Sequence, residues 1–419
     1  MKKLTILIIC GYKLRDIESL QYLKRQLEKK LKAKVYIVGG LSELQKMYYY
    51  LYTIRPDVVF IPQVLEKSCR RLAEYVLASN ALLYVIPAEI TVITVIEQLL
   101  LNPDISYNDH LTKFLIPGKR YEKLLMSSDI HKDKVAIVGS PKIDCLVNEE
   151  GSQFLSRKDF CKKIGANPRK KNVFIFTSFV RANEDYLRAD DFFKNTLDEM
   201  LKSNVCVDKT KVKYLQIIAK LCKDFNDYNI IVKPHPLEDA EVYRQQNGDN
   251  YYLITDTSLY SCINSIDLAI HWSSTVSTEC WIKNIPTIQL APFEKYDRFL
   301  SESHPGNPIV RTYEDLSNSI HIYLNKKLEG KYLQFQKNYI KNNFFKLDGN
   351  SAGRIVNIIK TDIKAKSLQV KFLPKFSWLI YVVLFFEKIF GYVIAHRLIA
   401  LVDSNYDWKA AIENKIYQE

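Results

Sequence analysis

Apolar runs alternate with helix-like segments from the amino terminus onward, and this rhythm constrains the fold more than any other feature. In the first part of the chain, helical patterns such as 19–31 and 66–79 separate expected strands at 4–10, 35–38, 58–62, 82–86, 114–116 and 135–138. Alternation of strand, helix and strand predicts βαβ units and a parallel sheet. We therefore expect a doubly wound, Rossmann-like α/β domain over residues 1–165.

The same alternation resumes after a polar, lysine-rich stretch at 148–171 that contains one helical pattern. Helices are expected at 211–225, 259–265 and 275–283, and strands at 173–177, 229–232, 252–255, 268–271 and 287–290. A chain of 419 residues is too long for one ordinary core. We predict a second Rossmann-like domain over 166–365, with a ligand bound beyond the carboxyl ends of the strands.

Residues 366–419 differ in kind, because an apolar and aromatic run starts at Phe376 and charges at Glu387 and Lys388 interrupt it. The run is therefore shorter than the roughly 20 apolar residues that span a bilayer. Its aromatic residues and flanking basic residues suit a segment that lies on an anionic membrane surface. We predict a hydrophobic and basic helical tail whose residues 371–402 contact the inner face of the cell membrane. A helix packed back on the protein is the alternative.

The formal net charge of +13 indicates an anionic partner, such as nucleic acid, a phosphorylated substrate or an acidic membrane. The lysines are scattered and form no known nucleic-acid motif, so we expect no nucleic-acid partner. The eight cysteines include no C-x-x-C pair, which favours reduced core residues over disulfides or a zinc site. A cytoplasmic protein that uses neither a metal nor a cofactor is the resulting expectation.

The first candidate motif is Lys233-Pro234-His235-Pro236, which directly follows an expected buried strand. Each proline lacks an N–H and fixes φ, so the chain must leave the sheet there with His235 at its rim. The imidazole could hydrogen-bond a phosphate or protonate it, and Lys233 could add positive charge. Glu238 and Glu241 follow the turn and could orient His235, although capping a helix is the simpler role.

The second motif, at 271–286, starts where another expected strand ends and contains Ser273, Ser274, Thr275 and Glu279. Ser273 or Ser274 could cap the helix that follows, where the first N–H groups have no partner within the helix. Those donors, the hydroxyls and the positive helix end could bind an anion, and Glu279 would share the helix face of Thr275. A plain helix cap is the alternative. Both motifs follow strands of one expected sheet, so they should converge at one edge.

Smaller signals surround these two motifs. Thr177, Ser178 and Asn183 follow the first strand of the second domain and could meet the same ligand, or could only form a turn. Asp256 follows the expected strand at 252–255 and could contact a ribose hydroxyl, or could simply start the next helix.

Several segments, taken in their order along the chain, resemble those of a known family. They are the two motifs above, Lys-Asn-Ile-Pro-Thr-Ile at 283–288, Val-Gly-Ser-Pro-Lys-Ile-Asp-Cys-Leu at 138–146, and the segments at 177–183 and 348–354. Together they resemble the bacterial surface carbohydrate biosynthesis family of GT-B glycosyltransferases over about residues 1–360. Ser140 stands where that family usually has asparagine.

The resemblance implies two Rossmann-like domains facing across a cleft, with a nucleotide bound mainly by the second. In the related sialyl- and Kdo-transferases, the His-Pro motif contacts the nucleotide and the Ser/Thr motif binds its phosphate. Those roles would fall on His235 and on Ser273, Ser274 and Thr275. The acidic catalytic residue of such enzymes is not evident, and Asp16 and Glu89 in the first domain are the candidates.

The resemblance therefore favours a glycosyltransferase that moves a sugar from a nucleotide-activated donor, with a CMP-sugar slightly favoured, to a surface polysaccharide or lipid-linked glycan. A CDP-glycerol-type glycerophosphotransferase is an alternative, because such enzymes share the Lys-Pro-His-Pro and Ser-Ser elements. A sugar-nucleotide 2-epimerase, which needs no acceptor, and a catalytically degenerate assembly partner are the others.

Overall fold

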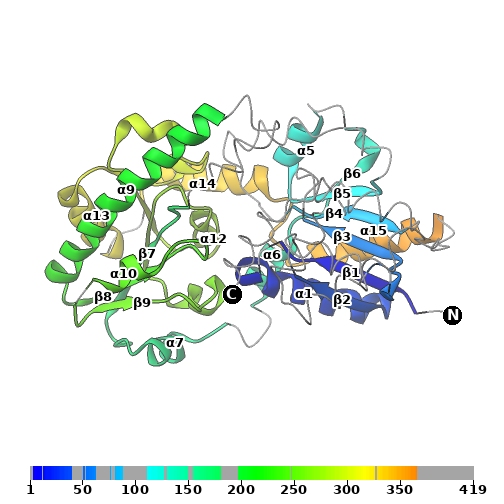
Figure 1. Cartoon of the computed structure of the whole chain (residues 1–419), viewed down its shortest axis with the longest axis horizontal. Coiled ribbons are helices and arrows are strands. Elements are labelled where there is room, and N and C mark those ends of the chain that lie inside the picture. Colours follow the sequence, from blue (N-terminus) through cyan, green and yellow to red (C-terminus); the bar gives the residue numbers. More distant parts are fainter. Residues whose placement is uncertain are drawn as a thin grey trace, which may run out of the picture. The chain divides into compact units, whose positions relative to one another are not determined.

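The computed structural model describes residues 3–11, 13–39, 51, 53–62, 76, 81–87, 111–126, 130–149, 154–180, 197–246, 248–325 and 328–365. The chain forms two compact units (Figure 1). Unit 1 comprises residues 1–90, 98–148 and 343–419, and unit 2 comprises residues 91–97 and 149–342. Within the described ranges, each unit is built around a parallel sheet of six strands.

The sheet of unit 1 has the strand order β2-β1-β3-β4-β5-β6. Its strands are β1 (Thr5–Ile9), β2 (Lys34–Val38), β3 (Val58–Ile61), β4 (Leu82–Val85), β5 (Lys113–Ile116) and β6 (Val135–Ile137). Each matches an expected strand to within two residues at either end. Because β1 pairs with both β2 and β3, the order reverses between β1 and β3, which is where open α/β sheets bind ligands.

The helices of unit 1 include one that comes from far along the chain. In the part of unit 1 that the structure describes, they are α1 (Lys13–Leu31), α5 (Lys119–Met126), α6 (Pro141–Asn148) and α15 (Ser351–Ala365), with a short 3-10 turn, η3, at Lys132–Lys134. Helix α15 contacts both α1 and α6. Its buried face, which includes Ile355, Val356 and Ile359, supplies the apolar surface for that packing.

Polar contacts fix the start of α15 in unit 1. The Ala352 N–H donates to Asp144 Oδ2 at 2.8 Å, and Arg354 Nε donates to the Val138 carbonyl at 2.6 Å. Arg354 also pairs with Asp348 at 2.9 Å. Burial raises the pKa of Asp144, and hydrogen bonds from the residues at 351 and 352 oppose that rise. These contacts bind α15 to the segment at 138–144.

Within the described residues, this division of the chain differs from the expected domain boundaries at two places. The first long segment of unit 1 ends at Asn148 instead of at 165, and residues 343–365 belong to unit 1 instead of to the second domain. The packing of α15 on α1 and α6 explains the second difference. Contacts of the helix at Arg157–Ile164 with the segment at 259–265 explain the first. The expected tail at 366–419 and the expected helix at 66–79, apart from Val76, lie outside the described residues.

The sheet of unit 2 has the strand order β12-β11-β10-β7-β8-β9. Its strands are β7 (Lys171–Phe176), β8 (Tyr228–Lys233), β9 (Tyr251–Leu253), β10 (Leu268–His271), β11 (Thr287–Leu290) and β12 (Ile309–Val310). Counted from β7, this is the Rossmann order 3-2-1-4-5-6, and it reverses between β7 and β10. Every strand expected in this half is present, and β12 is additional.

The helices among the described residues of unit 2 are α7 (Arg157–Ile164), α9 (Leu197–Asp224), α10 (Glu241–Arg244), α11 (Leu259–Cys262), α12 (Val276–Ile282), α13 (Tyr313–Asn325) and α14 (Gly330–Asn343), with 3-10 turns η5 (Ile263–Ser265), η6 (Glu294–Phe299) and η7 (His304–Gly306). Helix α9 starts 14 residues before the expected helix at 211–225. Its buried stripe passes through Thr210, whose hydroxyl lies 3.9 Å from Cys206 Sγ. Because this polar residue interrupts the apolar periodicity, the sequence pattern did not predict the first half of the helix.

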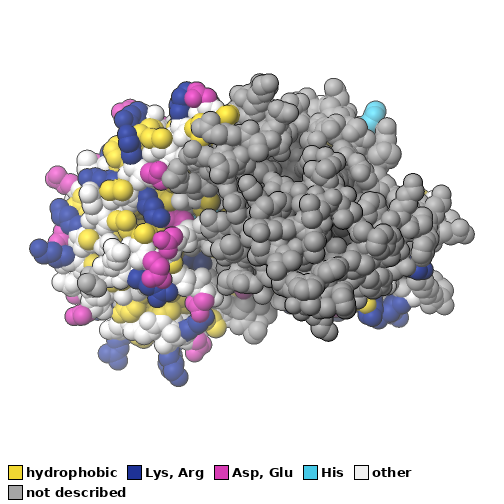
Figure 2. Space-filling view, viewed as in Figure 1, with side chains coloured by type: hydrophobic (Ala, Val, Ile, Leu, Met, Phe, Trp, Pro, Cys, Tyr) yellow, Lys and Arg dark blue, Asp and Glu magenta, His cyan; other side chains and the backbone are white. Residues whose placement is uncertain are grey.

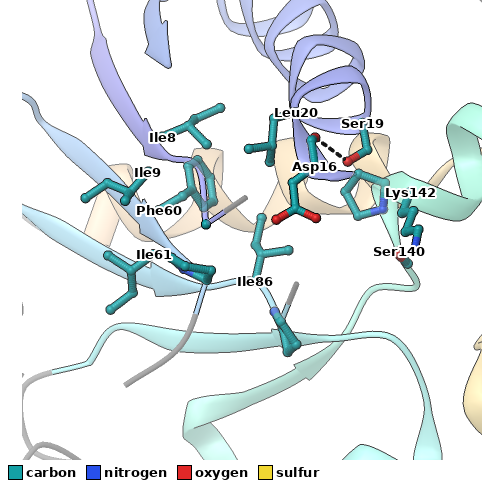
Figure 3. Close-up of a pocket in the computed structure, with 14 residues that line it drawn as sticks. Ile8, Ile9, Asp16, Ser19, Leu20, Phe60, Ile61, Ile86, Ser140 and Lys142 are labelled. Atoms are coloured by element: carbon teal, nitrogen blue, oxygen red, sulfur yellow. Dashed lines mark hydrogen bonds between the residues drawn. The ribbon is translucent and has the colours of Figure 1, made fainter. Parts of the chain in front are cut away.

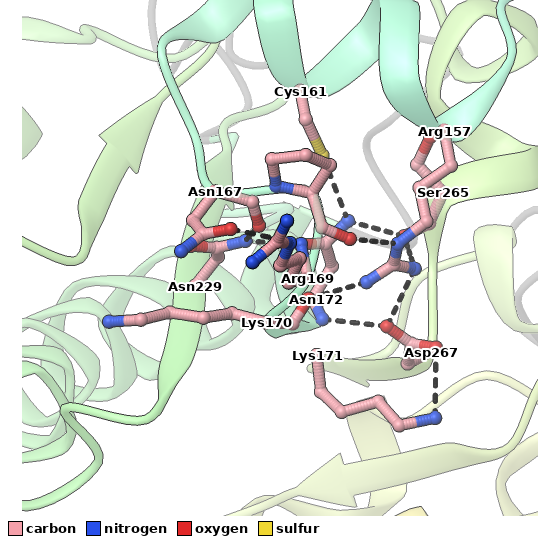
Figure 4. A network of polar contacts seen from close by, with 11 residues as sticks. Arg157, Cys161, Asn167, Arg169, Lys170, Lys171, Asn172, Asn229, Ser265 and Asp267 are labelled. Atoms are coloured by element: carbon pink, nitrogen blue, oxygen red, sulfur yellow. Dashed lines mark hydrogen bonds and ion pairs between the residues drawn. The ribbon is translucent and has the colours of Figure 1, made fainter.

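A buried polar network braces the amino ends of the strands of unit 2 (Figure 4). Asn229 Nδ2 on β8 donates to Asn172 Oδ1 on β7 at 2.7 Å, and Asn172 Nδ2 donates to the Ser265 carbonyl at 2.8 Å. Asp267 accepts the Asn172 N–H at 2.7 Å and pairs with Arg157 of α7 at 2.8 Å. Because ligands bind beyond the opposite ends of the strands, this network is structural.

The visible face of unit 2 carries basic and acidic side chains interspersed with one another and with apolar ones (Figure 2). The positive net charge is therefore not gathered into one patch on that face. In the described ranges, the seven cysteines present are buried and form no disulfide bond with one another. None of the helices within those ranges combines the length and the apolar character that crossing a membrane requires.

Candidate functional site

The loops that follow β7, β8 and β10 start from one edge of the sheet of unit 2. Phe176 at the end of β7 is paired with His271 at the end of β10 and with Lys233 at the end of β8. The expected convergence of the two motifs at one sheet edge is thus confirmed by the strand register. The position is also the point where the strand order reverses, which favours it as the ligand site of unit 2.

Glu238 ties the β7 loop to the His-Pro turn. Its Oε1 accepts hydrogen bonds from Thr177 Oγ1 at 2.7 Å, the Phe179 N–H at 3.0 Å and the His235 N–H at 3.2 Å. Its Oε2 accepts the Tyr243 hydroxyl at 2.6 Å. Burial, and then the charge of Glu238, raise the pKa of Tyr243 well above its ordinary value, so the hydroxyl keeps its proton. Glu238 therefore orients the turn instead of capping a helix.

His235 is held at the rim of the sheet, as the two prolines predicted. The strand ends at Lys233, and the imidazole is half-buried. Its Nδ1 accepts the Leu237 N–H at 3.2 Å, so the neutral ring carries its proton on Nε2. In that form His235 can donate a hydrogen bond to an anion through Nε2. The Lys233 carbonyl accepts a hydrogen bond from the Thr177 N–H at 3.3 Å, which joins the ends of β8 and β7.

The serine–threonine loop uses its three hydroxyls differently. Ser273, at φ 48°, accepts the Ser301 N–H at 2.8 Å and donates to the Phe299 carbonyl at 3.2 Å. Ser273 is therefore not the cap of α12. Ser274 Oγ accepts the Val276 N–H at 3.3 Å, which is a cap-type bond.

Thr275 stands directly before α12, and its side chain makes no capping bond there. It is half-buried. With Ser273 and Ser274 committed to contacts inside the unit, Thr275 is the hydroxyl of this loop that best suits a ligand. Glu279 lies one turn into α12 with 5 % of its surface exposed, and its part in binding stays a prediction.

The remaining candidates of unit 2 fall at different places. The Ser178 hydroxyl donates to the Trp272 carbonyl at 2.6 Å, which joins the loops after β7 and β10. Asp256 is exposed after the edge strand β9 and accepts the Thr257 hydroxyl at 3.1 Å, so its contact with a ribose stays a prediction. Asn183 of unit 2 and Glu89 of unit 1 lie outside the described residues.

Unit 1 contains a small cavity at its own reversal of strand order (Figure 3). It encloses about 40 Å³, enough for a water or a hydroxyl group. Asp16, which has 6 % of its surface exposed, points its carboxylate into the cavity. The other lining residues come from α1, from the ends of β1, β3 and β4, and from the start of α6, where Ser140 precedes the helix and Lys142 lies in it.

The position of Asp16 follows from the start of α1. Gly11 ends the β1 loop, and a Cβ there would lie 3.4 Å from Asp16 Oδ2. The Ser19 hydroxyl donates to the Asp16 carbonyl at 2.8 Å within the same helix. Asp16, a candidate acid of the sequence, thus faces a cavity of unit 1 that could hold a water or one hydroxyl group. Among the described residues of both units, no group of three or more metal-ligating side chains gathers.

Solved structures share this fold at low sequence identity. A structure described as a UDP-N-acetylglucosamine 2-epimerase from Listeria monocytogenes has a TM-score of 0.57 and 12% identity, over 89% of this chain and 100% of that one. The Wall Teichoic Acid Polymerase TagF has a TM-score of 0.56 and 15% identity, over 86% and 89% of the two chains. The S. aureus MnaA-UDP co-structure has a TM-score of 0.54 and 12% identity, over 88% and 100%. These likenesses confirm the predicted two-domain α/β fold of the GT-B type.

No curated protein matches the chain. A family model does match, described as CDP-Glycerol:Poly(glycerophosphate) glycerophosphotransferase, over residues 101–361. This confirms the expectation of a transferase, and the match is not specific to Kdo- or sialyltransferases. Because the matched segment covers more than half of the chain, the protein belongs to the CDP-glycerol:poly(glycerophosphate) glycerophosphotransferase family.

Proposed function

We propose that this transferase moves glycerol phosphate from CDP-glycerol to a hydroxyl of a growing surface polymer. Family membership supports this donor better than the CMP-sugar that the sequence had favoured. The CDP-glycerol alternative thus replaces the first expectation. The acceptor would be a glycan or glycerophosphate polymer that is destined for the cell surface. The contact of 371–402 with the anionic inner face of the membrane remains part of the proposal.

The observation that carries the donor assignment is the pairing of adjacent strand ends in unit 2. Thr275 follows β10, and His235 follows β8, with β7 between the two strands. A diphosphate needs hydrogen-bond donors along its length, and a hydroxyl and an Nε2–H would serve two of its oxygens. Lys233 would add positive charge. Thr177 and Ser178 hold the loop between them through Glu238 and Trp272.

The proposed reaction is a substitution at phosphorus. The acceptor oxygen forms a bond to the phosphorus that carries glycerol, while the bond from that phosphorus to the CMP oxygen breaks and CMP leaves with the electron pair. His235 would donate a hydrogen bond to the leaving phosphate and so stabilise the charge that develops there. The proton of the acceptor hydroxyl must pass to a base, and we propose the buried carboxylate of Asp16 for this role.

The test measures release of CMP by the purified protein with CDP-glycerol and a glycerophosphate-primed acceptor, compared with CMP-sugars. We expect CMP release that depends on the acceptor with CDP-glycerol, and no such release with the CMP-sugars. UDP-N-acetylglucosamine without an acceptor serves to test the epimerase alternative. Epimerisation of that compound, or transfer only from a CMP-sugar, would refute the proposal.

Replacement of His235 by alanine tests the donor site directly. If His235 stabilises the leaving phosphate, turnover should fall by roughly 10²–10⁴-fold. If it only orients the donor, the loss should appear mainly in KM. His131→Ala, which removes an exposed histidine of unit 1, is the matched control and should leave both constants unchanged. Full activity of the His235→Ala protein would exclude the assigned role.

A further inference from the structure

Behind the serine–threonine loop lies a chain of buried polar side chains that the proposed reaction does not use. It runs from Trp281 on α12 through Thr287 on β11 and Asn307 to His271, the last residue of β10. Each of these four side chains has 5 % or less of its surface exposed. Buried polar groups cost free energy unless their hydrogen bonds are made, so the direction of each bond is informative.

The bonds in this chain can run in one direction only. Trp281 Nε1 can only donate, and it lies 2.8 Å from Thr287 Oγ1. The Thr287 hydroxyl therefore gives its own proton to Asn307 Oδ1 at 2.6 Å. Asn307 Nδ2 donates to the Ser303 carbonyl at 3.2 Å, which fixes the orientation of the amide. His271 Nε2, 3.2 Å from the same Oδ1, must then carry a proton.

The other ring nitrogen of His271 faces the loop. Its Nδ1 lies 3.4 Å from the Ser274 N–H and accepts a hydrogen bond from it. Burial lowers the pKa of His271 to about 4, so the ring is neutral near pH 7 and Nδ1 is available as an acceptor. Both nitrogens are thus assigned by their partners, without regard to any ligand.

The consequence for the loop is geometric. The bond to His271 turns the Ser274 N–H toward the interior, directly after Ser273 at φ 48°. A serine in this left-handed conformation is strained and persists only where its surroundings hold it. Two contacts with the segment 299–301 hold Ser273, and His271 holds Ser274. Thr275 is the next residue, so its position follows from theirs.

We propose that His271 is a positioning residue for the phosphate-binding loop. As a neutral acceptor, it fixes Ser274 and so sets the hydroxyl and N–H of Thr275 toward the phosphate of the nucleotide. This inference rests on the proposed function for the identity of the ligand only. A histidine that merely fills the core would contribute to stability and would not discriminate between a nucleotide and its nucleoside.

Two substitutions separate the two ring nitrogens. An asparagine side chain reaches the place of Nδ1, and a glutamine side chain reaches the place of Nε2. His271→Asn can therefore keep the bond from Ser274 and loses the bond to Asn307, whereas His271→Gln does the reverse. Thr287→Val disturbs the same network without touching the loop, and is the matched control.

Calorimetry with CMP and with cytidine, which lacks the phosphate, measures the effect. His271→Gln should weaken CMP binding roughly tenfold, the loss expected for one hydrogen bond, and leave cytidine binding unchanged. His271→Asn and Thr287→Val should keep the CMP-to-cytidine affinity ratio of the wild type, although all three variants should unfold at a lower urea concentration than the wild type. Equal ratios in both His271 variants, or equal losses for CMP and cytidine in His271→Gln, would overturn the inference.

The proposed function can fail separately. If the wild-type protein binds UDP and not CMP, the CDP-glycerol donor is refuted. The same variants measured with UDP against uridine then decide the role of His271 by the same criterion.

Discussion

Replacing Glu238 with glutamine should loosen two loops of the candidate site at once. The carboxylate joins Thr177 and Phe179 of the β7 loop to His235 of the adjacent turn, and it also holds Tyr243 of α10. Glutamine has the same shape and can place an amide oxygen where Oε1 lies. Its NH₂ group then faces the Tyr243 hydroxyl, which must turn from donor to acceptor.

The size of the effect follows from the four bonds. Hydrogen bonds to a charged acceptor contribute about 1.5–3 kcal/mol, and those to a neutral one about 0.5–1.5 kcal/mol. Each bond thus weakens by about 1 kcal/mol, and solvent reaches the half-buried side chain and reduces the sum. We expect Glu238→Gln to lower the free energy of unfolding of unit 2 by roughly 2–3 kcal/mol. We also expect it to raise KM for the donor, because both loops lose a shared anchor.

Urea unfolding followed by tryptophan fluorescence measures the first effect, and CMP release at varied donor concentration measures the second. Glu241→Gln is the matched control, since Glu241 lies three residues away and pairs with Arg244 on the surface at 2.8 Å. An exposed pair of this kind contributes under about 1 kcal/mol. If Glu238→Gln and Glu241→Gln unfold at the same urea concentration, the anchoring role is refuted.

Three further outcomes are expected. Burial lowers the pKa of His271 from 6.5 to about 4. Its contribution to stability is therefore full above pH 6.5 and declines toward pH 4 by about 3 kcal/mol, because the unfolded chain takes up the proton first. Urea titrations of the wild type and His271→Asn should converge as the pH falls, and parallel curves would contradict this. Asp16→Asn should slow CMP release by roughly 10²-fold or more without changing donor affinity, whereas a normal rate would remove Asp16 as the base. Deleting residues 371–402 should abolish sedimentation with anionic vesicles and leave CMP binding intact, and vesicle binding that persists would place the contact elsewhere.

Most of the sheet architecture was predictable from the sequence, because each strand is a short apolar run with clear ends. The two-residue strand β12 (Ile309–Val310) was missed, since it is too short to show a pattern. The first half of α9 was missed because Thr210 occupies its buried stripe. The assignment of α15 to unit 1 was also missed, because periodicity predicts a helix but does not indicate the sheet against which it packs.

For the candidate site, the positions of the motifs were predictable and their hydrogen-bond partners were not. The register of parallel strands brings His235 and Thr275 to one edge, and this follows from strand order and local sequence alone. The hydrogen-bond partners of each hydroxyl do not follow from the local sequence. Glu238 was favoured as a cap because its contact with Thr177 spans 61 residues, and Asn307 was overlooked because it lies 36 residues after His271. Contacts of such range depend on tertiary packing, which residue spacing does not encode.

The return of α15 to unit 1 has a consequence for synthesis of the protein. The N–H of Ala352, which bonds to the Asp144 carboxylate, is synthesised 208 residues after Asp144. At about 5–20 residues per second, that interval is roughly 10–40 s on the ribosome. The long segment of unit 2 at 149–342 emerges entirely within it. The faces of α1 and α6 that will receive α15 stay uncovered throughout, so the amino-terminal unit begins first and is completed last, with chaperones able to bind it in between.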